Sequence, residues 1–467
     1  MDYDTRMGEI IFHNTMGGRK EPFVPLQAGE VRMYTCGPTV YNFAHIGNFR
    51  TFVFQDILRR FLLSRGLHVI QVMNFTDVDD RIIANAAAEG VDIRTYTEKY
   101  IEAFLADRRA LSLEMPEYMV RATEHIDDLV KLIERLTAKG FTYVSEGSTY
   151  FRISKFPNYG KLTKLDVTGI QAGARVDVDQ YDKADARDFA LWKAPKPGEF
   201  FWETRIGPGR PGWHIECSAM AMKYLGETID IHSGGVDLAF PHHENEIAQS
   251  EAATGKRFVD YWLHAEHLLV NFEKMSKSLG NFFTLRDLLA KGNKPSALRF
   301  LLASVPYRRQ LNFTQEGLQQ ASSSVERLRN FAGRLRSGKF PAGISPVSED
   351  AIKAERDFEH GLEDDLNTPR AITELQRLVY GGAGAETPGL QAELLAGGRM
   401  LGLLGQRPQD WFHRGADQSR IDERIAARIE ARKQRRFADA DRIRAELAGE
   451  GIVLEDKPDG TTEWRRA

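Results

Sequence analysis

Val31-Arg32-Met33-Tyr34-Thr35-Cys36 has the alternating pattern of a β-strand, and Gly37-Pro38 ends it. An apolar pattern with helical spacing follows from about residue 45 to residue 63, and residues 68–75 form a second apolar segment typical of a strand. Strand, helix and strand in this order predict a βαβ unit, and therefore a parallel sheet that binds ligands beyond the carboxyl ends of its strands. We expect Cys36 to lie at such an end.

The chain has only two cysteines, Cys36 and Cys217, and each lies beside histidine-rich or glycine-rich sequence. Their wide separation excludes a local zinc knuckle, so a shared metal ion would have to be held by tertiary folding. Further ligands are expected from Pro-His-His-Glu-Asn-Glu, because a helix that starts at Pro241 places His242 and Glu246 on one face. The alternative is that both cysteines fill the core as small apolar side chains.

The composition is that of an ordinary globular protein, with 42% hydrophobic and 28% charged residues among 467. This length predicts about two to four domains. Two cysteines exclude a disulfide framework, the acidic start is unlike a signal peptide, and no apolar stretch reaches a membrane-spanning length. We therefore expect a cytoplasmic protein without a membrane partner. A net charge of −3 argues against non-specific coating of DNA but allows a nucleic-acid partner on a local basic face.

Two segments carry the donors that a phosphate site needs. The first lies between the predicted strand and helix, where His45 and Asn48 are three residues apart at a helix start and Gly47 allows close approach. It lacks the G-x-G-x-x-G fingerprint, and taken alone it is explained more simply by chance or by helix capping. The second is Lys-Met-Ser-Lys-Ser-Leu-Gly-Asn, in which Lys274 and Lys277 form a cationic loop able to close over a polyphosphate.

The rest of the chain divides into an insertion and a helical carboxyl-terminal half. Residues from about 92 to 200 are expected to be inserted into the sheet domain and to contain a hairpin that turns at Glu146-Gly147. The sheet should resume near residue 229 and again at about 258–270. Helices are expected from residue 285 onward, with breaks near 338–348 and 381–389.

A final helix is expected at 420–437, with arginines spaced by four at Arg420, Arg424, Arg428 and Arg432. Such a stripe is most often a solvated helix face, although it also suits contacts to phosphates.

Taken together, these segments resemble a known family. Lys274-Met275-Ser276-Lys277-Ser278 and His45-Ile46-Gly47-Asn48 resemble the paired signatures of class I aminoacyl-tRNA synthetases, and within that class the chain is similar to the cysteinyl-tRNA synthetases of bacterial type. The further segments that carry this resemblance are Thr35–Tyr41, Arg210–Ser218, Phe240–Glu246, Asp364–Pro369 and Leu454–Asp456. One departure is Asn48, which replaces the last histidine of the first signature but can still donate a neutral hydrogen bond.

The resemblance implies activation of L-cysteine by ATP with Mg²⁺, followed by transfer of cysteine to the 3′ end of cysteine tRNA. It implies one zinc ion on Cys36, Cys217, His242 and Glu246. The implied ATP contacts and catalytic residues are Thr39, His45, Gly47, Asn48, Lys274 and Lys277. Trp213 and His232 are expected to line the substrate pocket, although a core tryptophan is the simpler interpretation of Trp213.

The implied fold is α/β: a Rossmann-like parallel-sheet domain with an inserted acceptor-binding subdomain, then a helical bundle and a small carboxyl-terminal domain. The expected boundaries are 1–90 with 200–270 for the catalytic domain, 91–199 for the insertion, 271–320 for the stem-contact region, 321–404 for the bundle and 405–467 for the anticodon-recognition domain. A monomer is expected. The alternatives are a paralogous ligase of mycothiol synthesis, which passes cysteine to an amino-sugar inositol, and a non-catalytic tRNA-binding zinc protein.

Overall fold

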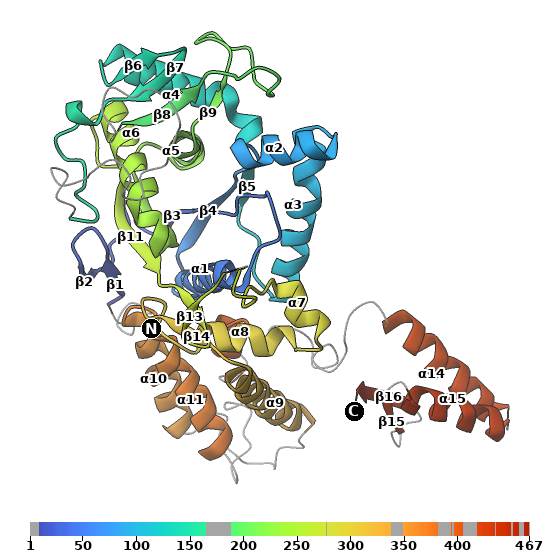
Figure 1. The fold of residues 1–467 in the computed structure, drawn as a ribbon. Helices are drawn as coiled ribbons and strands as arrows, with labels where there is room; N and C mark the ends of the chain where they lie inside the picture. The colour runs from blue at the N-terminus through green and yellow to red at the C-terminus, as the bar shows by residue number, and fades with distance from the viewer. Residues whose placement is uncertain are drawn as a thin grey trace.

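A five-stranded parallel sheet forms the centre of the computed structural model (Figure 1). In order across the sheet, the strands are β11 (Val259–Ala265), β10 (Ile229–Gly235), β3 (Glu30–Thr35), β4 (His68–Phe75) and β5 (Tyr118–Arg121). The structure describes residues 9–164, 188–276, 278–337, 349–381, 394, 397–404, 418–434, 436–449, 452–456 and 462–466. The predicted βαβ unit is confirmed, because β3 and β4 pair in parallel and flank helix α1 (Ile46–Ser64).

Two helices pack directly on the strands of the central sheet. Helix α1 packs on β4 and β10, and α5 (Trp213–Leu225) packs on β3 and β4. Phe49 and Leu58 of α1 are fully buried in the main core, together with Val31 of β3 and Val72 of β4. The helices α2 (Asp80–Glu89), α3 (Ile93–Ala110) and α6 (Glu244–Thr254) complete this part of the molecule.

The expected insertion forms an antiparallel sheet beside helix α4 (Ile126–Ala138), near the top of Figure 1. Its strands are β6 (Thr142–Ser145), β7 (Ser148–Phe151), β8 (Phe189–Lys193) and β9 (Arg210–Pro211). The predicted hairpin is confirmed as β6 and β7, with left-handed backbone at Glu146 and Gly147. Strand β5, which the sequence placed inside the insertion, instead pairs with β4 at the edge of the central sheet. The antiparallel unit therefore begins after this strand.

A small three-stranded sheet connects the central domain to the helical half. Strand β12 (Leu268–Val270) lies between β13 (Glu273–Lys274) and β14 (Leu311–Phe313). The apolar run predicted as one strand over 258–270 is thus two strands in two sheets. The helices that follow are α7 (Leu285–Ala290), α8 (Pro295–Ala303), α9 (Gln315–Ser337), α10 (Glu349–Glu363) and α11 (Thr368–Gly381). Both breaks predicted in this half fall largely outside the described residues.

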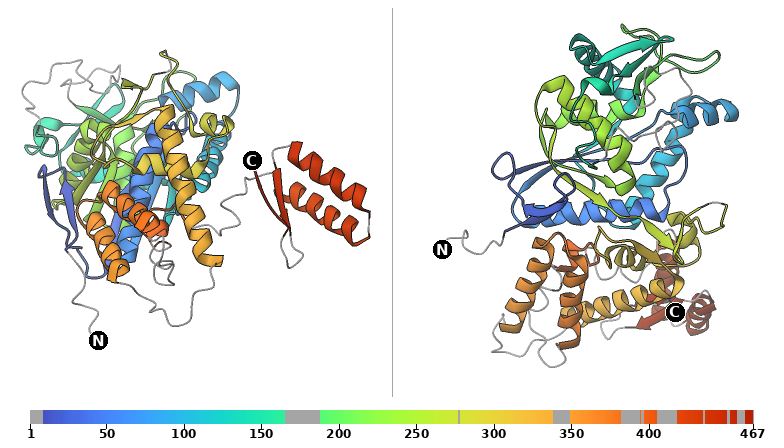
Figure 2. Two further views of the ribbon diagram at one scale, coloured as in Figure 1. Left: turned by 90° about the horizontal axis from the view of Figure 1, so that it is seen from below. Right: turned by 60° about the vertical axis from the view of Figure 1, so that its left-hand side comes forward.

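The carboxyl-terminal module consists of two helices and a hairpin, which Figure 2 shows packed together. Its elements are α14 (Gln418–Lys433), α15 (Phe437–Gly449), β15 (Ile452–Asp456) and β16 (Thr462–Arg466). Ile425, Leu447 and Leu454 form a small core of its own. The single helix predicted over 420–437 is wrong, because α14 ends at Lys433 and α15 starts at Phe437.

The arginine stripe of α14 is not a continuous solvent-facing surface. Arg428 is buried and donates a hydrogen bond to Thr462 of the hairpin, and Arg424 pairs with Glu446 of α15 at 2.5 Å. Two members of the stripe therefore hold the module together, while Arg432 is exposed. The side chain of Arg420 lies outside the described residues. No helix in the described part of the chain is both long and apolar enough to cross a membrane.

Candidate active site

The two cysteines meet at the carboxyl edge of the central sheet. Cys36 directly follows β3, and Cys217 lies on the second turn of α5; both are buried. Their sulfur atoms lie in one group with an imidazole nitrogen of His242 and a carboxylate oxygen of Glu246, with all four atoms within 4.8 Å of one another. The four residues predicted as metal ligands are therefore brought together by folding, as the wide separation of the cysteines requires.

His242 and Glu246 lie on one continuous helical stretch, as predicted. Phe240 has an extended backbone, and the chain is helical from Pro241 onward. The first turn, up to His243, is a π-helical turn that leads directly into α6 at Glu244. Nε2 of His242 lies 3.0 Å from Oε1 of Glu246. The predicted helix start and the pairing of the two side chains are both confirmed, and the π-helical first turn is the one difference.

Negative charge gathers on two members of this group. Burial acts to raise the pKa of Glu246, but nearby His232 and His242 outweigh it and lower the pKa to about 2. The hydrogen bond with Cys36 lowers the pKa of Cys217 to about 6, and burial raises that of Cys36. Burial acts to lower the pKa of His242, but Glu246 and Cys217 outweigh it and raise it to about 10. A proton on His242 thus balances negative charge on Glu246 and Cys217, and a bound dication would take the place of that proton. Sulfur, nitrogen and oxygen donors of this kind suit a borderline-soft dication such as Zn²⁺.

More histidines surround the group than the sequence analysis selected. Nδ1 of His214 lies 2.9 Å from Nδ1 of His242, and Nδ1 of His243 lies 2.7 Å from Nε2 of His264. Burial lowers the pKa of His264 to about 3, so that ring is neutral at pH 7. The signal for His214 and His243 was their position beside predicted ligands in the sequence. Nothing in the sequence around His264 indicated its role.

The two residues expected in the substrate pocket border this group of four ligand atoms. Nε2 of His232 lies 2.9 Å from Oε2 of Glu246, so His232 orients that carboxylate. With Cys36, His243 and Glu246 it also forms a second set of four clustered ligand atoms. The half-buried indole of Trp213 stacks on the ring of His242, with centroids 4.4 Å apart. Both residues are thus placed to border a molecule bound at the group.

The first phosphate candidate forms a reciprocal helix cap. The backbone N–H of Asn48 donates to Nδ1 of His45 at 3.1 Å, and the backbone N–H of His45 donates to Oδ1 of Asn48 at 3.1 Å. Because Nδ1 accepts and burial lowers the pKa of His45, its ring is neutral and carries its proton on Nε2. A Cβ atom at Gly47 would lie 3.0 Å from the His45 ring, which explains the glycine.

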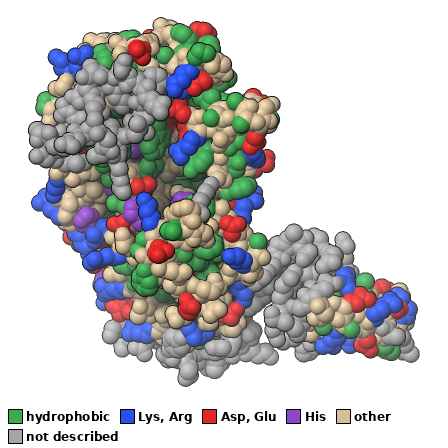
Figure 3. Space-filling view, in the orientation of Figure 1, with side chains coloured by type: hydrophobic (Ala, Val, Ile, Leu, Met, Phe, Trp, Pro, Cys, Tyr) green, Lys and Arg blue, Asp and Glu red, His purple; other side chains and the backbone are tan. Residues whose placement is uncertain are grey.

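The second phosphate candidate lies against the first. The Ile46 N–H donates to the Phe283 carbonyl at 3.0 Å, and a Cβ atom at Gly47 would lie 3.2 Å from Cε of Met275. Asn281 closes the loop by accepting from the Ser276 N–H at 2.8 Å. In the space-filling view, histidine and basic side chains gather at a hollow in the middle of this face (Figure 3).

The structure describes only some of the other side chains that were expected to bind phosphate. Lys274 is exposed and has no acidic partner among the described residues, so its charge is available to a ligand. Lys277 lies outside the described residues. Thr39 pairs with Thr76 just beyond the end of β4, on the carboxyl side of the sheet.

The comparisons with known proteins agree with this geometry. Residues 22–323 match the family model described as the tRNA synthetases class I (C) catalytic domain. The chain is 54% identical to the Cysteine--tRNA ligase of Solibacter usitatus and 49% identical to that of Koribacter versatilis, covering 97% of this chain and 99% of the relative in both cases. Its fold resembles that of Mycobacterium tuberculosis methionyl-tRNA synthetase in complex with methionyl-adenylate, with a TM-score of 0.57 at 14% identity, over 80% of this chain and 90% of that one.

Proposed function

Because the chain belongs to the cysteine--tRNA ligase family, we propose that its buried group of Cys36, Cys217, His242 and Glu246 holds one zinc ion at which the substrate cysteine is selected. The enzyme activates L-cysteine with ATP and transfers it to the 3′ end of cysteine tRNA. The curated relatives favour this activity over the amino-sugar ligase considered as an alternative.

The zinc proposal rests on one observation, the set of four clustered ligand atoms. A bound zinc ion would supply strong affinity for thiolate sulfur and weak affinity for a neutral hydroxyl oxygen. This difference matters because an apolar pocket separates two such similar groups only weakly, by about a hundredfold. Selection by a thiophilic ion would therefore allow cysteine to be distinguished from serine without an editing step.

The neighbouring side chains would prepare this pocket. His214 and His232 hold His242 and Glu246 by hydrogen bonds of 2.9 Å each, and second partners of this kind fix the orientation of metal ligands. Trp213, stacked on His242, would form an apolar wall beside the bound cysteine.

ATP would bind at the start of α1. Nε2–H of His45 and the side-chain amide of Asn48 would donate to its phosphates, at a helix start whose dipole favours anions. Gly47 keeps the approach open, and Thr39 would border the nucleotide. Mg²⁺ would accompany the phosphates, held largely by phosphate oxygens and water.

Catalysis would rest on positioning and charge. Cysteine activation joins the amino-acid carboxylate to the α-phosphorus of ATP and releases pyrophosphate, so no protein nucleophile is needed. Lys274 and Lys277 would stabilise the negative charge that grows on the departing pyrophosphate. The carboxyl-terminal module would contribute to tRNA recognition. We further propose that the enzyme works as a monomer in the cytoplasm, where its two free thiols stay reduced.

The zinc proposal is tested by metal analysis combined with cysteine-dependent pyrophosphate exchange. We expect about one zinc per chain, loss of exchange on removal of the metal, and recovery when zinc is added back. The ratio of cysteine to serine in exchange provides the second measurement. Fully active protein that contains no zinc would contradict the proposal.

A further inference from the structure

Phe272, in the turn between β12 and β13, has both a strained backbone and an exposed apolar ring. Its φ is 66° and that of Asn271 is 51°, so both residues of this two-residue hairpin turn have left-handed backbone. Such a turn is of type I′, in which glycine is the usual second residue because a Cβ atom is disfavoured at positive φ. The Phe272 side chain is also 81% exposed, the highest value among the large hydrophobic residues that the structure describes.

Contacts of the main chain hold the turn in this conformation. The Asn271 N–H donates to the Phe313 carbonyl at 3.1 Å, and the Phe272 N–H donates to Oδ1 of Asn312 at 2.6 Å. Both partners belong to β14, which pairs with β12 in parallel. These contacts do not use the phenyl ring, so a smaller side chain at position 272 could form the same turn.

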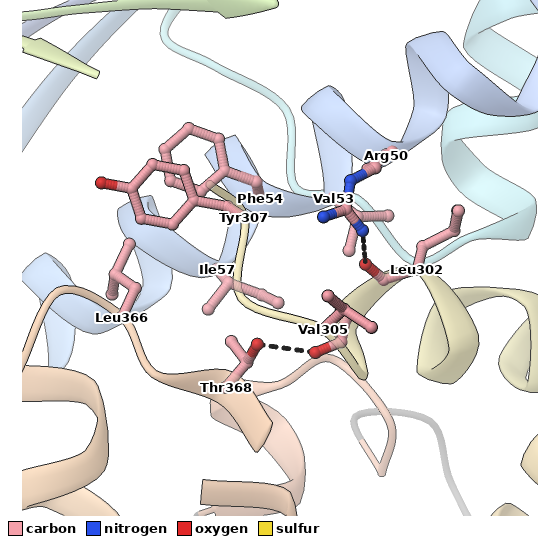
Figure 4. A pocket seen from close by; sticks show the side chains of 10 residues that line it. Arg50, Val53, Phe54, Ile57, Leu302, Val305, Tyr307, Leu366 and Thr368 are labelled. Atoms are coloured by element: carbon pink, nitrogen blue, oxygen red, sulfur yellow. Dashed lines mark hydrogen bonds between the residues drawn. The ribbon is translucent and has the colours of Figure 1, made fainter. Parts of the chain in front are cut away.

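Leu366 shows how the same kind of strain is offset inside the protein. It is the other large apolar residue with left-handed backbone in the described part of the chain, with a φ of 49°. Its side chain is buried and lines a small cavity together with Ile57 and Tyr307 (Figure 4). Burial of apolar surface therefore offsets its strained backbone. The Phe272 ring has no comparable burial within the chain.

The turn lies close to the proposed site of adenylate formation. Phe272 is two residues before Lys274, whose exposed charge has no acidic partner among the described residues. Met275, the next residue, lies against the start of α1, since a Cβ atom at Gly47 would be 3.2 Å from its Cε. Three residues of chain span at most about 10 Å, so the exposed ring lies within reach of a large ligand at this site.

We propose that the Phe272 ring stacks on an unpaired nucleotide of cysteine tRNA. This inference rests on the proposed function, because tRNA must approach the adenylate to receive cysteine. A strained backbone and an exposed apolar ring without internal compensation are typical of a binding surface. The free charge of Lys274 suits a polyanion, and a base offers the aromatic face on which an exposed ring can stack. Bases inside a duplex are already covered by their neighbours, so the nucleotide must be unpaired.

The first experiment compares dissociation constants of full-length variants for cysteine tRNA. Phe272→Gly gives the turn the Asn-Gly sequence that its backbone prefers. We expect this variant to bind tRNA about fivefold or more weakly, because the contact with one stacked base is lost. Its melting temperature should stay the same or rise by a few degrees, because the strain is relieved. Phe272→Tyr keeps an aromatic ring and should bind tRNA within about twofold of the unaltered enzyme.

A photo-crosslinking residue gives a direct readout of the contact. With p-benzoylphenylalanine at position 272, we expect the enzyme to crosslink to cysteine tRNA on irradiation, and excess unlabelled cysteine tRNA should compete. The crosslinked nucleotide should map to an unpaired part of the tRNA. The control is the same probe at position 24, because Val24 is a similarly exposed apolar residue, at 67%, just after strand β2 (Arg19–Pro22).

Three results would overturn the inference. The first is a tRNA affinity of Phe272→Gly equal to that of the unaltered enzyme. The second is a lower melting temperature of that variant, which would show that the ring is stabilised within the chain itself. The third is crosslinking to tRNA from position 272 that does not exceed crosslinking from position 24. Failure of the underlying function is seen separately, as an unaltered enzyme that does not charge cysteine tRNA.

Discussion

Cys36 and Cys217 come from a strand end and a helix far apart in the sequence, yet their sulfur atoms lie in one buried group with His242 and Glu246. Either cysteine alone is compatible with an ordinary core position. Together they are more distinctive, because the same group contains a carboxylate whose pKa is about 2, a thiol whose pKa is about 6 and the imidazole of His242, whose pKa is about 10. Burial of such groups is costly unless a partner compensates their charge.

We predict that Cys217→Ser weakens both zinc retention and cysteine activation, because a neutral hydroxyl is a poor replacement for a thiolate ligand. The expected loss in metal affinity is at least about 10- to 100-fold. Metal content after dialysis against a chelator and pyrophosphate exchange measure the two effects. Met220→Leu, a buried change of similar volume on the same helix, serves as the control. A metal-depleted Cys217→Ser protein with full activity would leave the group a structural role at most.

We predict that Lys277→Ala lowers adenylate formation by two to three orders of magnitude, or about 3–4 kcal/mol, and leaves cysteine binding nearly intact. Lys274→Ala should act in the same direction, since its exposed charge is otherwise unused in the described structure. The control is Lys291→Ala, an exposed lysine outside the loop. Exchange rates within threefold of normal for Lys277→Ala would show that the loop does not hold the pyrophosphate.

Asp107 lies 3.3 Å from Arg286. We predict that ionisation of Asp107 makes the free energy of unfolding depend on pH. Burial raises the pKa of Asp107 to about 6, against the attraction of Arg286. Because the folded-state pKa is the higher one, the folded protein binds this proton more tightly. The resulting stabilisation is complete below about pH 4 and disappears as the pH rises through about 6.

Asp107→Asn cannot release this proton. Relative to the unaltered protein, its stability should therefore increase between about pH 4 and pH 6. Urea midpoints of the two proteins at several pH values measure the difference, and groups common to both cancel. A difference that moves the other way would mean that the ion pair with Arg286 outweighs burial.

We predict that removal of residues 406–467 spares cysteine-dependent pyrophosphate exchange and weakens charging of tRNA. The module has its own small core of Ile425, Leu447 and Leu454, so its loss leaves the main core intact. The loss in tRNA affinity should shrink as salt rises, because salt screens the basic contacts that the module supplies. Charging at the normal rate by the shortened chain would exclude a recognition role.

The sequence predicted most of what depends on local pattern. The limits of β3, β4 and α1 follow from apolar periodicity and from the capping residues His45 and Asn48. The ligand set was found because chemically distinctive residues are rare in this chain. Its local backbone was predicted correctly in that the chain is helical from Pro241 onward, but the π-helical first turn before Glu244 could not be read from the sequence.

The sequence could not predict which distant residues each side chain faces. A spacing of four between Arg424 and Arg428 predicts one helix face but does not say whether that face meets solvent or the module's own hairpin. His264 was missed for a similar reason, because only the pairing of β10 and β11 brings it beside His243. Contacts of this kind depend on elements that are distant in the chain.

The reciprocal cap at the start of α1 also limits how position 48 can evolve. Asn48 uses its side-chain oxygen to cap the helix, and its amide group is the part proposed to bind ATP. A replacement must therefore satisfy helix stability and catalysis at the same time, and a drop in activity after mutation would not by itself tell which was lost. Selection at this position would favour side chains that combine an acceptor with a donor, as the asparagine amide does.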